Sequence, residues 1–514
     1  MTTSPDGLVE TKLLPPRARG QTVPRPRLDE LLRRGGDATL LLVSAPAGFG
    51  KTTLLGTWLA TSGRDRTTAW VSLDERDRDA SLFWTYVLLA VDRAAPGSAT
   101  AALALLQSGQ AATESVLTAL INELSVRPDD LTLVLDDYHL ADGPDLRTGM
   151  TFLIDHLPPQ VHVVISSRAD PGLPLARLRA RGELVEIRAA ELRFTGDETA
   201  IFLNELNALS LEPSELTALE GRTEGWAAAL QLAVLSLRDR EDGSAFIAGF
   251  AGDDRYVVDY LADEVLDRQP ADVRRFLLDT SLLERLTPDL CDAVTGTTEG
   301  RAMLESLERQ NLFVVPLDAH RHWYRYHHLF ADVLRAHLLG ERPDDAPALH
   351  RRASAWFDQA GDPEAAVRHA LAAGDVDLAA ALAESAIRPL LRERREAVIG
   401  RWVEELPRDI VRNRPVLAVG FVAALAESNR FDGLAARLDD VERLLAGPAD
   451  DLVVIERSEL PRLPAAVATY RAALALVEGD LDGTVENAEL ALARNADDDH
   501  LTMASASALL GLAS

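Results

Sequence analysis

Short apolar runs alternate with longer, more polar segments over the first part of the chain. The runs are four or five residues long and apolar at nearly every position. They lie at Thr39–Val43, Ala69–Leu73, Leu131–Leu135, His162–Ser166 and Leu184–Ile187. Strands that are buried on both faces of a parallel sheet have this composition. Because the segments between the runs are long enough for crossover helices, the pattern predicts a βαβ fold.

The pattern becomes mostly helical from about Gly196 to Gly340. Apolar residues recur at spacings of three to five in Leu261–Leu266 and Asp272–Leu283. Two short apolar runs, Leu312–Leu317 and His322–Tyr326, then flank a polar turn. Helices followed by one small hairpin predict a winged-helix module.

The remaining chain is rich in alanine and leucine, and Gly-Asp turns such as Gly361-Asp362 and Gly374-Asp375 separate its helical segments. Closely packed helix pairs need small residues where the helices touch, so the pattern predicts helical repeats. The final helix, from about His500 to Ser514, lacks a polar cap. Since a stack of repeats needs a cap, we expect this chain to be the front part of a longer protein.

Composition narrows the class of protein. A chain of 514 residues exceeds one hydrophobic core, so several domains are expected. With 53 basic and 81 acidic residues the net charge is −28, and such a surface repels nucleic-acid backbones. The single cysteine, Cys291, excludes a disulfide scaffold and indicates a reducing compartment.

The sequence also indicates a cytoplasmic protein without a membrane span. The longest apolar run, Pro415 to Ala426, is far shorter than the roughly 20 residues that a membrane helix needs. The first residues, Met1 to Gly7, lack the basic and then apolar pattern of a signal peptide.

Residues Ser44–Thr53 carry the strongest functional signal. Their sequence is Ser-Ala-Pro-Ala-Gly-Phe-Gly-Lys-Thr-Thr, directly after a predicted strand and before a helical run at Leu54–Ala60. That is the context of a phosphate-binding loop, in which backbone N–H groups surround a β-phosphate at a helix N-terminus. Lys51 would bridge the β- and γ-phosphates, and the Thr52 hydroxyl would hold Mg²⁺.

Three details of this loop bear on its function. Gly48 and Gly50 permit close approach of the backbone to a phosphate. Ala45 replaces the first glycine of the usual pattern, which is tolerable if it keeps a negative φ. Lys12 and Lys51 are the only lysines among 53 basic residues, so position 51 has a role that a compact ammonium fills better than a guanidinium.

Two further predicted strands end in charged residues. The run that begins at Leu131 ends in Asp136 and Asp137. Asp136 is expected to face Mg²⁺, and Asp137 to orient or deprotonate the attacking water. The run His162–Ser166 leads to Arg168, whose positive charge near the γ-phosphate would distinguish ATP from ADP.

These three strand ends, taken in order, resemble those of signal-transduction ATPases with numerous domains, the STAND class. More narrowly, the chain is similar to the MalT-like large ATP-binding regulators of the LuxR family over nearly its whole length. The motifs that carry the resemblance are Thr11–Pro16, Val23–Leu28, Ser44–Thr53, Trp70–Glu75, Leu135–Leu140, Ser166–Arg168, Leu173–Gly182, Glu224–Leu230, Tyr326–Phe330 and the repeats after Arg342.

The resemblance implies a role for individual residues. Val23 and Arg25 would lie beside the adenine. The phosphate loop would comprise Ala47, Gly48, Phe49, Gly50, Lys51, Thr52 and Thr53, with Asp136 and Asp137 as the acidic pair and Arg168 as the sensor.

Two more positions are implied beyond the sheet. Trp226 stands where the class has a helical-lid contact to the nucleotide, although Ala227 replaces the usual proline. His327 would touch the β-phosphate of ADP and hold the lid closed, with His328 as the adjacent alternative. From the residues alone, a histidine after an aromatic run is equally well explained as an interface residue.

The fold class that follows is multidomain α/β plus α. We expect a P-loop nucleotide-binding domain at residues 1–195 and a helical lid at 196–255. A winged-helix domain would occupy 256–341, and helical TPR-like repeats 342–514.

The resemblance implies an ATP-dependent, signal-responsive transcriptional regulator. ADP would clamp the nucleotide-binding domain against the winged helix. An inducer, a small molecule or a protein, would act at the helical repeats, open the clamp and permit ATP exchange and self-association. Slow hydrolysis of ATP to ADP and phosphate would reset the switch. From Pro343 onward there are 18 basic and 30 acidic residues, so DNA binding is expected only through a region outside this chain.

Other functions stay open on the residues alone. A P-loop enzyme would need a second-substrate pocket, for which the sequence has no Ser/His/Asp or metal-ligand constellation. A scaffold could use the repeats to bind partners around a dead ATPase, although Lys51, Thr52 and Asp136 are intact. A motor-type ring is less favoured, because no arginine-finger position is recognisable.

Overall fold

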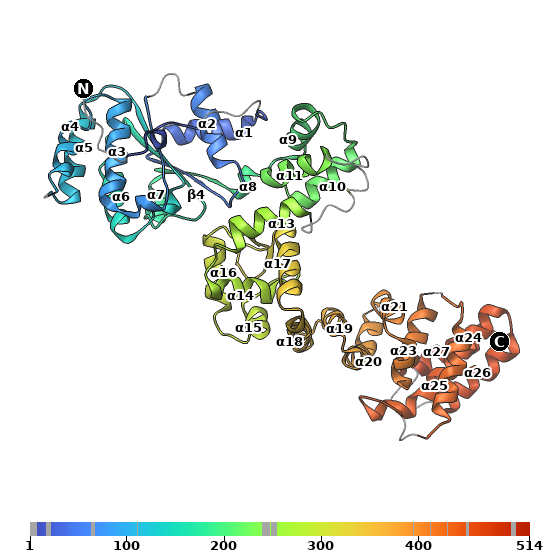
Figure 1. Cartoon of the computed structure of the whole chain (residues 1–514). Coiled ribbons are helices and arrows are strands. Elements are labelled where there is room, and N and C mark those ends of the chain that lie inside the picture. The colour runs from blue at the N-terminus through green and yellow to red at the C-terminus, as the bar shows by residue number, and fades with distance from the viewer. Residues whose placement is uncertain are drawn as a thin grey trace. The chain divides into compact units, whose positions relative to one another are not determined.

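The computed structural model describes residues 8–16, 22–62, 67–109, 111–238, 247, 254–393, 395–411, 413–428, 430–448, 452–494 and 500–513 (Figure 1). Part of the predicted lid, residues 239–246 and 248–253, lies outside the described residues. The chain divides into two compact units, which are considered separately. The first comprises Met1–Pro288 and Glu299–His337, and the second comprises Asp289–Thr298 and Leu338–Ser514.

A five-stranded sheet forms the centre of the first unit. Its strands are β1 (Leu40–Ser44), β2 (Thr67–Ser72), β3 (Leu131–Asp136), β4 (Val161–Ser167) and β5 (Leu184–Arg188). The order β2-β3-β4-β1-β5 is parallel throughout, so all carboxyl ends lie at one edge. The five apolar runs predicted as strands are confirmed, to within two residues at each end.

Helices pack on both faces of this sheet. They are α1 (Pro26–Gly36), α2 (Lys51–Ser62), α3 (Ala80–Ala94), α4 (Thr100–Gln107), α5 (Thr113–Ser125), α6 (Pro144–Asp155), α7 (Leu175–Arg181) and α8 (Ala189–Leu192), with 3-10 turns η1 (Glu10–Leu13), η3 (Glu75–Arg78) and η4 (Tyr138–Leu140). Leu40 and Leu42 point to one face and join a buried cluster with Phe83 of α3. Leu41 points to the other face, where a Cβ on Gly35 of α1 would lie 2.7 Å from its methyl group. The alternation along one strand therefore supplies two cores.

The chain then forms the helices of the predicted lid and winged helix. They are α9 (Gly196–Ala200), η5 (Ile201–Leu206), α10 (Pro213–Thr223), α11 (Ala227–Arg238), α13 (Arg255–Leu261), η6 (Ala262–Leu266), α14 (Ala271–Thr280), α15 (Pro288–Thr295), α16 (Gly300–Arg309) and α17 (His328–Glu341). Strands β6 (Val314–Pro316) and β7 (Tyr324–Tyr326) pair antiparallel, which confirms the predicted hairpin. Cys291 is fully buried in α15, and burial raises the pKa of its thiol, as expected of a core residue.

The second unit is a stack of helices. They are η7 (Pro343–Asp345), α18 (Ala346–Gln359), α19 (Pro363–Ala372), α20 (Val376–Arg392), α21 (Glu396–Glu405), α22 (Arg408–Val411), α23 (Pro415–Glu427), α24 (Leu434–Leu445), η9 (Arg457–Arg462), α25 (Leu463–Glu478), α26 (Leu481–Arg494) and α27 (His500–Ala513). The long apolar run is α23, which contacts α20, α21, α24 and α25 and is buried on nearly all sides. Among the described residues, no helix has the length and apolar character that crossing a membrane requires.

The Gly-Asp pairs explain where these helices stop and start. Gly361 and Gly374 have φ of 77° and 71°, a left-handed conformation that ends a helix and that glycine adopts without strain. The next residues cap the following helices: Asp362 accepts from the N–H of Ala365 at 3.1 Å, and Asp375 from Leu378 at 3.2 Å. One dipeptide therefore ends one helix and begins another.

The packing of α23 generates a prediction about stability. Phe421 is 1% exposed and lies in the cluster that includes Trp402. Phe421→Ala should lower the unfolding free energy of the helical unit by about 3–5 kcal/mol, because the lost ring leaves a cavity. Val477→Ala, at an exposed position of α25, should change it by less than about 0.5 kcal/mol. Urea unfolding followed by circular dichroism measures both, and equal midpoints for the two variants would contradict the assigned burial.

Candidate nucleotide-binding site

The loop from Ala45 to Gly50 joins the carboxyl end of β1 to α2. Gly48 and Gly50 have φ of 75° and 78°, where a side chain would be strained. Ala45 is not among the described residues with a positive φ, so its side chain is accommodated as expected. The backbone N–H groups of Gly48 and Gly50 donate no hydrogen bond to another described residue. The loop thus offers unpaired donors at the start of a helix.

The ammonium of Lys51 lies inside this loop. The residue is 6% exposed, and its Nζ donates to the carbonyl oxygens of Ala45 and Pro46 at 2.9 and 3.1 Å. Burial lowers the pKa of Lys51 to about 8, the charge of Asp137 opposes the shift, and the charge of Arg168 adds to it. Because its hydrogen-bond partners among the described residues are carbonyl oxygens, this buried cation is stabilised by any anion that reaches it.

Asp136 ends β3 opposite the start of α2. The Thr52 hydroxyl donates to both of its carboxylate oxygens, at 3.1 and 3.0 Å, and the Ser166 hydroxyl donates to one of them. Burial and the neighbouring charge of Asp137 raise the pKa of Asp136, against these two hydrogen bonds. A divalent cation would relieve both causes of the shift, so the donor set of Thr52 and Asp136 fits Mg²⁺.

Asp137 follows in a left-handed conformation with φ of 56°. Its N–H donates to the Ser166 hydroxyl at 3.1 Å, while its side chain is 40% exposed and lies 3.9 Å from Nδ1 of His139. Burial, with the charges of Arg168 and Lys51, lowers the pKa of His139 to about 3, so the imidazole is neutral at pH 7. The turn therefore directs the two adjacent carboxylates differently, one into the sheet edge and one toward its surface.

Arg168, just after β4, pairs with the segment that enters the winged helix. Its guanidinium lies 3.2 Å from the Glu264 carboxylate and also donates to the Glu264 carbonyl at 3.4 Å. The Asn311 amide donates to the carbonyl of Arg168 at 3.0 Å and to the hydroxyl of Ser44 at 2.9 Å. Two winged-helix residues are thus bonded to the carboxyl ends of β1 and β4.

The lid lies directly on the phosphate loop. Nε1 of Trp226 donates to the carbonyl of Ala47, and the N–H of Ala228 donates to the carbonyl of Gly48, both at 3.0 Å. A Cβ on Gly48 would be 2.5 Å from the Cβ of Ala228. A side chain at position 48 would therefore strain the loop and also push α11 away from it.

Aromatic rings fill the space between the loop, the lid and the winged helix. Trp226 is fully buried, and its ring centroid lies 6.5 Å from Phe49 and 5.1 Å from Phe313. Phe313 also lies 6.3 Å from Phe49. These three rings connect three parts of the chain through one apolar contact, with edge-to-face geometry between Trp226 and Phe313.

Glu224 joins the lid to the winged helix by charge. Its carboxylate accepts from both terminal nitrogens of Arg325 at 2.7 and 2.8 Å and lies 3.1 Å from Arg193. Burial alone would raise the pKa of Glu224, but the hydrogen bonds of Arg325 and the nearby positive groups lower it to about 2. The N–H of His328, at the start of α17, also donates to it at 3.2 Å.

His327 is buried in the same interface. Its ring lies 5.9 Å from that of Trp226, and its Nε2–H donates to the carbonyl of Thr223 at 3.1 Å. Its Nδ1 is buried without a hydrogen-bond partner among the described residues. Burial lowers the pKa of His327 to about 4, although Glu224 raises it. A phosphate oxygen needs a donor, so contact with a phosphate at Nδ1 would require that this neutral ring first gain a proton.

The N-terminal residues implied for adenine lie at the other side of the lid. The guanidinium of Arg25 bonds to the Glu198 carboxylate at 3.1 Å and to the carbonyl of Leu192 at 2.8 Å, and it lies over the ring of Phe194. Val23 is half-buried. Their contact with adenine stays a prediction, as do the roles of the phosphate-loop residues, among which Thr53 is exposed.

Sequence reasoning missed several contacts of this site. Glu264 and Asn311 bind the loop edge from the winged helix, and Phe313 closes the aromatic cluster. Asn311 and Phe313 have φ of 50° and 56°, a left-handed conformation that asparagine adopts readily but that is unexpected for phenylalanine. Glu224 is the first residue of the motif Glu224–Leu230. Nothing in the sequence identifies its partners Arg193 and Arg325, which lie 31 residues before and 101 residues after it.

Comparison with known proteins begins with the winged helix. Residues 262–346 match the family model described as the MalT winged helix domain. The match includes the β6–β7 hairpin and overlaps the range of 256–341 expected from the sequence.

Relatives extend the match well beyond that domain. The Serine/threonine-protein kinase PknK of Mycobacterium tuberculosis is 36% identical over 441 residues, 84% of this chain and 40% of the kinase. The HTH-type transcriptional regulator MalT of Cronobacter sakazakii is 33% identical over 491 residues, 94% of this chain and 53% of the regulator. MalT of Klebsiella pneumoniae is 38% identical over 375 residues. The chain spans about half or less of the length of these relatives.

Among solved structures, a Signal Transduction ATPase with Numerous Domains (STAND) protein with a tetratricopeptide repeat sensor from Pyrococcus horikoshii covers 97% of this chain and 68% of its own. It is 13% identical with a TM-score of 0.38, too low to add to the argument. The sequence matches stand without it. Residues 262–346 match a MalT winged-helix domain, and over most of its length the chain is similar to MalT regulators.

Proposed function

We propose that this chain is the nucleotide-switched part of a signal-responsive regulator that acts in the cytoplasm. ADP would favour the closed arrangement of loop, lid and winged helix, and ATP an open one. The observation that carries the proposal is the meeting, at one sheet edge, of the buried Lys51, the Thr52–Asp136 pair and a loop with unpaired backbone donors. The lid contacts the same loop through Trp226 and Ala228.

The chemistry of these groups fits a nucleoside diphosphate or triphosphate with Mg²⁺. A nucleotide bound as its Mg²⁺ complex would supply negative phosphate oxygens together with the divalent cation. Lys51 would exchange its bonds to the carbonyls of Ala45 and Pro46 for bonds to phosphate oxygens. Thr52 and Asp136 would hold the cation, and Asp137 would orient or deprotonate a water for slow hydrolysis.

Arg168 supplies a means of distinguishing the two nucleotides. In the closed arrangement its guanidinium is paired with Glu264, which lies near the start of the MalT winged-helix match. A γ-phosphate would compete with Glu264 for this guanidinium, whereas ADP has no group to compete. A ligand shifts a two-state equilibrium only through contacts that differ between the states. Exchange of Arg168 between the two anions is such a difference.

The output of the switch lies beyond these residues. One relative is named as a transcriptional regulator and another as a protein kinase, and each aligns with most of this chain. We therefore favour DNA binding through a region outside the 514 residues, with self-association in the ATP state. An inducer, a small molecule or a protein, would act on the helical repeats.

The kinase match supports a second candidate, a switch that controls an output other than DNA binding. The kinase aligns with 84% of this chain, so a region of similar sequence is also present in a protein that is named as a kinase and not as a transcriptional regulator. The coding sequence on both sides of these residues decides between the candidates. A helix-turn-helix frame downstream supports the regulator, and a catalytic domain on either side supports the alternative.

Nucleotide binding should depend on one of the two lysines. Lys51→Ala removes the buried ammonium and should abolish binding of ATP and of ADP in calorimetry. Lys12→Ala is the matched control, because it removes the other lysine, which pairs with Asp77 away from the loop. Unchanged affinity in Lys51→Ala, or equal loss in Lys12→Ala, would refute the site.

The ratio of ATP to ADP affinity should depend on Arg168. Arg168→Ala should reduce a preference for ATP by about tenfold, because one charge-assisted hydrogen bond is lost. Glu264→Gln removes the competing carboxylate and should raise the ATP to ADP ratio. Arg268→Ala is the control, since Arg268 also pairs with Glu264, at 2.7 Å, but from the turn that directly follows the helical segment of Glu264. A ratio that is equal in all four proteins would contradict the exchange.

Acid should weaken the closed interface through His327. The pKa of folded His327 is about 4, below the 6.5 of a free imidazole, so as the pH falls the unfolded or open form takes up the proton first. The stability contributed by the neutral ring is complete above pH 6.5 and declines toward pH 4, by up to about 3 kcal/mol.

The test compares wild type with His327→Gln. Thermal unfolding of both proteins is measured at several values between pH 7 and pH 4. The difference between the two melting temperatures should shrink as the pH falls. Only the wild type has an imidazole at position 327, which the unfolded chain protonates more readily than the folded chain does. His139 and His369, whose pKa values are also lowered by burial, are present in both proteins and cancel in the difference. A constant difference would contradict the assigned burial of His327.

A further inference from the structure

A pocket of about 690 Å³ opens in the second unit between α21, α22, α23 and α24. Its apolar lining comes from Val403, Leu406 and Leu425, with the ring of Phe431 at the turn before α24. Leu406 and Leu425 are 3% and 6% exposed, so the wall of the pocket is the packed core of the helical stack.

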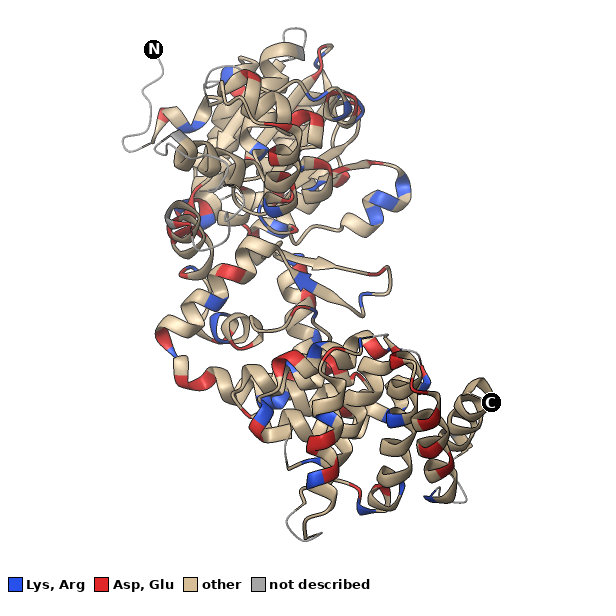
Figure 2. Ribbon diagram, turned by 90° about the vertical axis from the view of Figure 1, so that its right-hand side faces the viewer, with Lys and Arg blue, Asp and Glu red and all other residues tan. Residues whose placement is uncertain are grey.

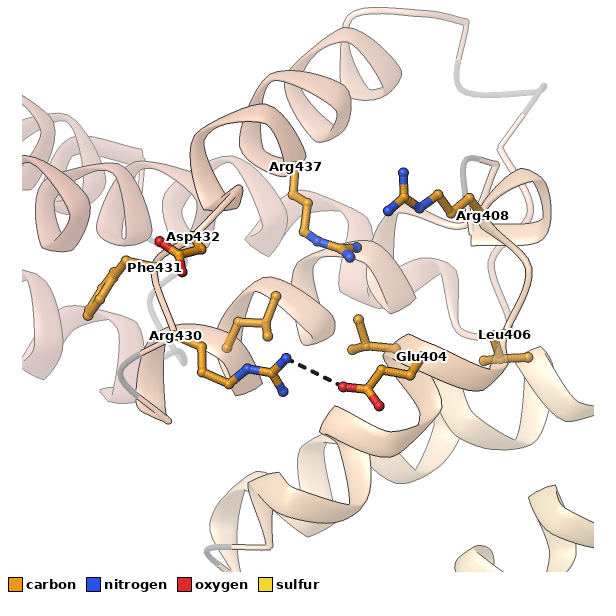
Figure 3. Close-up of a pocket in the computed structure, with 9 residues that line it drawn as sticks. Glu404, Leu406, Arg408, Arg430, Phe431, Asp432 and Arg437 are labelled. Carbon is orange, nitrogen blue, oxygen red and sulfur yellow. Dashed lines mark hydrogen bonds and ion pairs between the residues drawn. The ribbon is translucent and has the colours of Figure 1, made fainter.

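Three arginines from three different elements converge on this pocket. Arg408 lies on α22, Arg430 follows α23, and Arg437 lies on α24. Figure 3 shows the side chains of Arg408 and Arg437 extending toward one another, with Arg430 below them. The positive charges repel one another. Burial is the main cause that lowers the pKa of Arg437, the charges of Arg408 and Arg430 lower it further, and the charge of Asp440 opposes the shift.

Carboxylates of the described residues pair with one of these three arginines. Arg430 lies 3.4 Å from the Glu404 carboxylate. The guanidinium groups of Arg408 and Arg437 make no hydrogen bond or ion pair with another described residue. Asp432 also lines the pocket, but no described contact joins it to an arginine.

Two other arginines of the second unit, Arg414 and Arg471, are paired with carboxylates of neighbouring helices. Arg414 lies 3.5 Å from Glu384, and Arg471 lies 3.0 Å from Glu442. Figure 2 shows acidic and basic residues interspersed along these helices. In a chain of net charge −28, carboxylates are available for pairing almost everywhere. Arginine supplies nearly all basic residues of the chain, so Arg408 and Arg437 are distinguished by their position and not by their type.

We propose that this pocket binds a small organic phosphate, a monoester whose dianionic group lies between Arg408 and Arg437 and whose apolar part packs on Leu406, Leu425 and Phe431. This assignment gives a ligand class to the inducer of the proposed function, on which its regulatory meaning rests. The binding itself needs neither Lys51 nor the sheet.

The charge and shape of the pocket favour this class. Two unpaired guanidinium groups are matched by a dianion, and planar guanidinium groups bind phosphate oxygens in pairs. A monocarboxylate would neutralise only one of them. The apolar wall provides burial for a hydrocarbon or aromatic portion, which inorganic phosphate lacks.

Phenyl phosphate is the probe, titrated by calorimetry into the whole chain. It should bind more tightly than inorganic phosphate, benzoate or phenol, because only the probe has both the dianion and the ring. Arg437→Gln and Arg408→Gln should each weaken its binding by about tenfold. Arg494→Gln is the matched control, because it removes an equal charge at an exposed position on α26, and it should change the affinity by less than about twofold.

A variant that is expected to gain affinity gives a result that misfolding cannot explain. Glu404→Gln removes the carboxylate that competes for Arg430, and it should tighten phenyl phosphate binding about threefold. The proposal is overturned if the probe does not bind, if benzoate binds equally well, or if Arg494→Gln weakens binding as much as the pocket variants.

Localisation separates this pocket from the phosphate loop. Phenyl phosphate should slow hydrogen–deuterium exchange in residues 403–411 and 430–437, and it should do so equally in the Lys51→Ala protein. Protection confined to the phosphate loop would overturn the pocket. Loss of nucleotide binding with retained protection here would leave this site standing, so the two proposals fail separately.

Discussion

The burial of the Lys51 ammonium is the constraint on which the first unit depends. A cation that is 6% exposed is costly unless anions or dipoles surround it, and among the described residues its direct partners are two loop carbonyls. Asp136 and Asp137 supply negative charge from the neighbouring region of the sheet edge, and their effect on the pKa of Lys51 opposes that of burial. The parallel sheet makes this possible, because it brings the carboxyl ends of β1, β3 and β4 to one edge. Charges from distant parts of the chain therefore meet without any side chain having to extend far.

The lid and the winged helix both contact this site, so it connects them to the sheet. Lid donors cap the carbonyls of Ala47 and Gly48, and winged-helix residues bind Arg168 and Ser44. The ion pair of Arg168 is half-buried and within reach of water, so it exchanges more easily than the fully buried contacts of Trp226. A nucleotide would act most easily on the former. A switch requires such a division, since some contacts must define the closed state and others must respond to the ligand.

The helical unit uses different physics to the same end. Its stability comes from small residues and apolar clusters along closely packed helices, with Gly-Asp turns that fix where each helix ends. Because the helices are held by their buried residues, side chains at the surface of the stack contribute little to its stability. Arg408 and Arg437 are two such side chains, and their like charges lie beside the apolar wall of the pocket. In both units the polar groups without partners lie where the fold has already rigidified the backbone around them, which lowers the entropic cost of binding a ligand there.

Local pattern determined the strands, the hairpin, the helical repeats and the sequence of the phosphate loop, because each depends on residues that are neighbours along the chain. Lys51 stood out by composition, and Asp136 and Arg168 by their positions at the ends of apolar runs. The tertiary structure alone decided that Arg168 pairs with Glu264, that Glu224 gathers two arginines, and that residue 48 must lack a side chain to admit α11. Those contacts join residues 31 to 180 positions apart, and no periodicity of two or 3.6 residues records such a distance. Their energies depend on burial and on partners that exist only once the chain has folded.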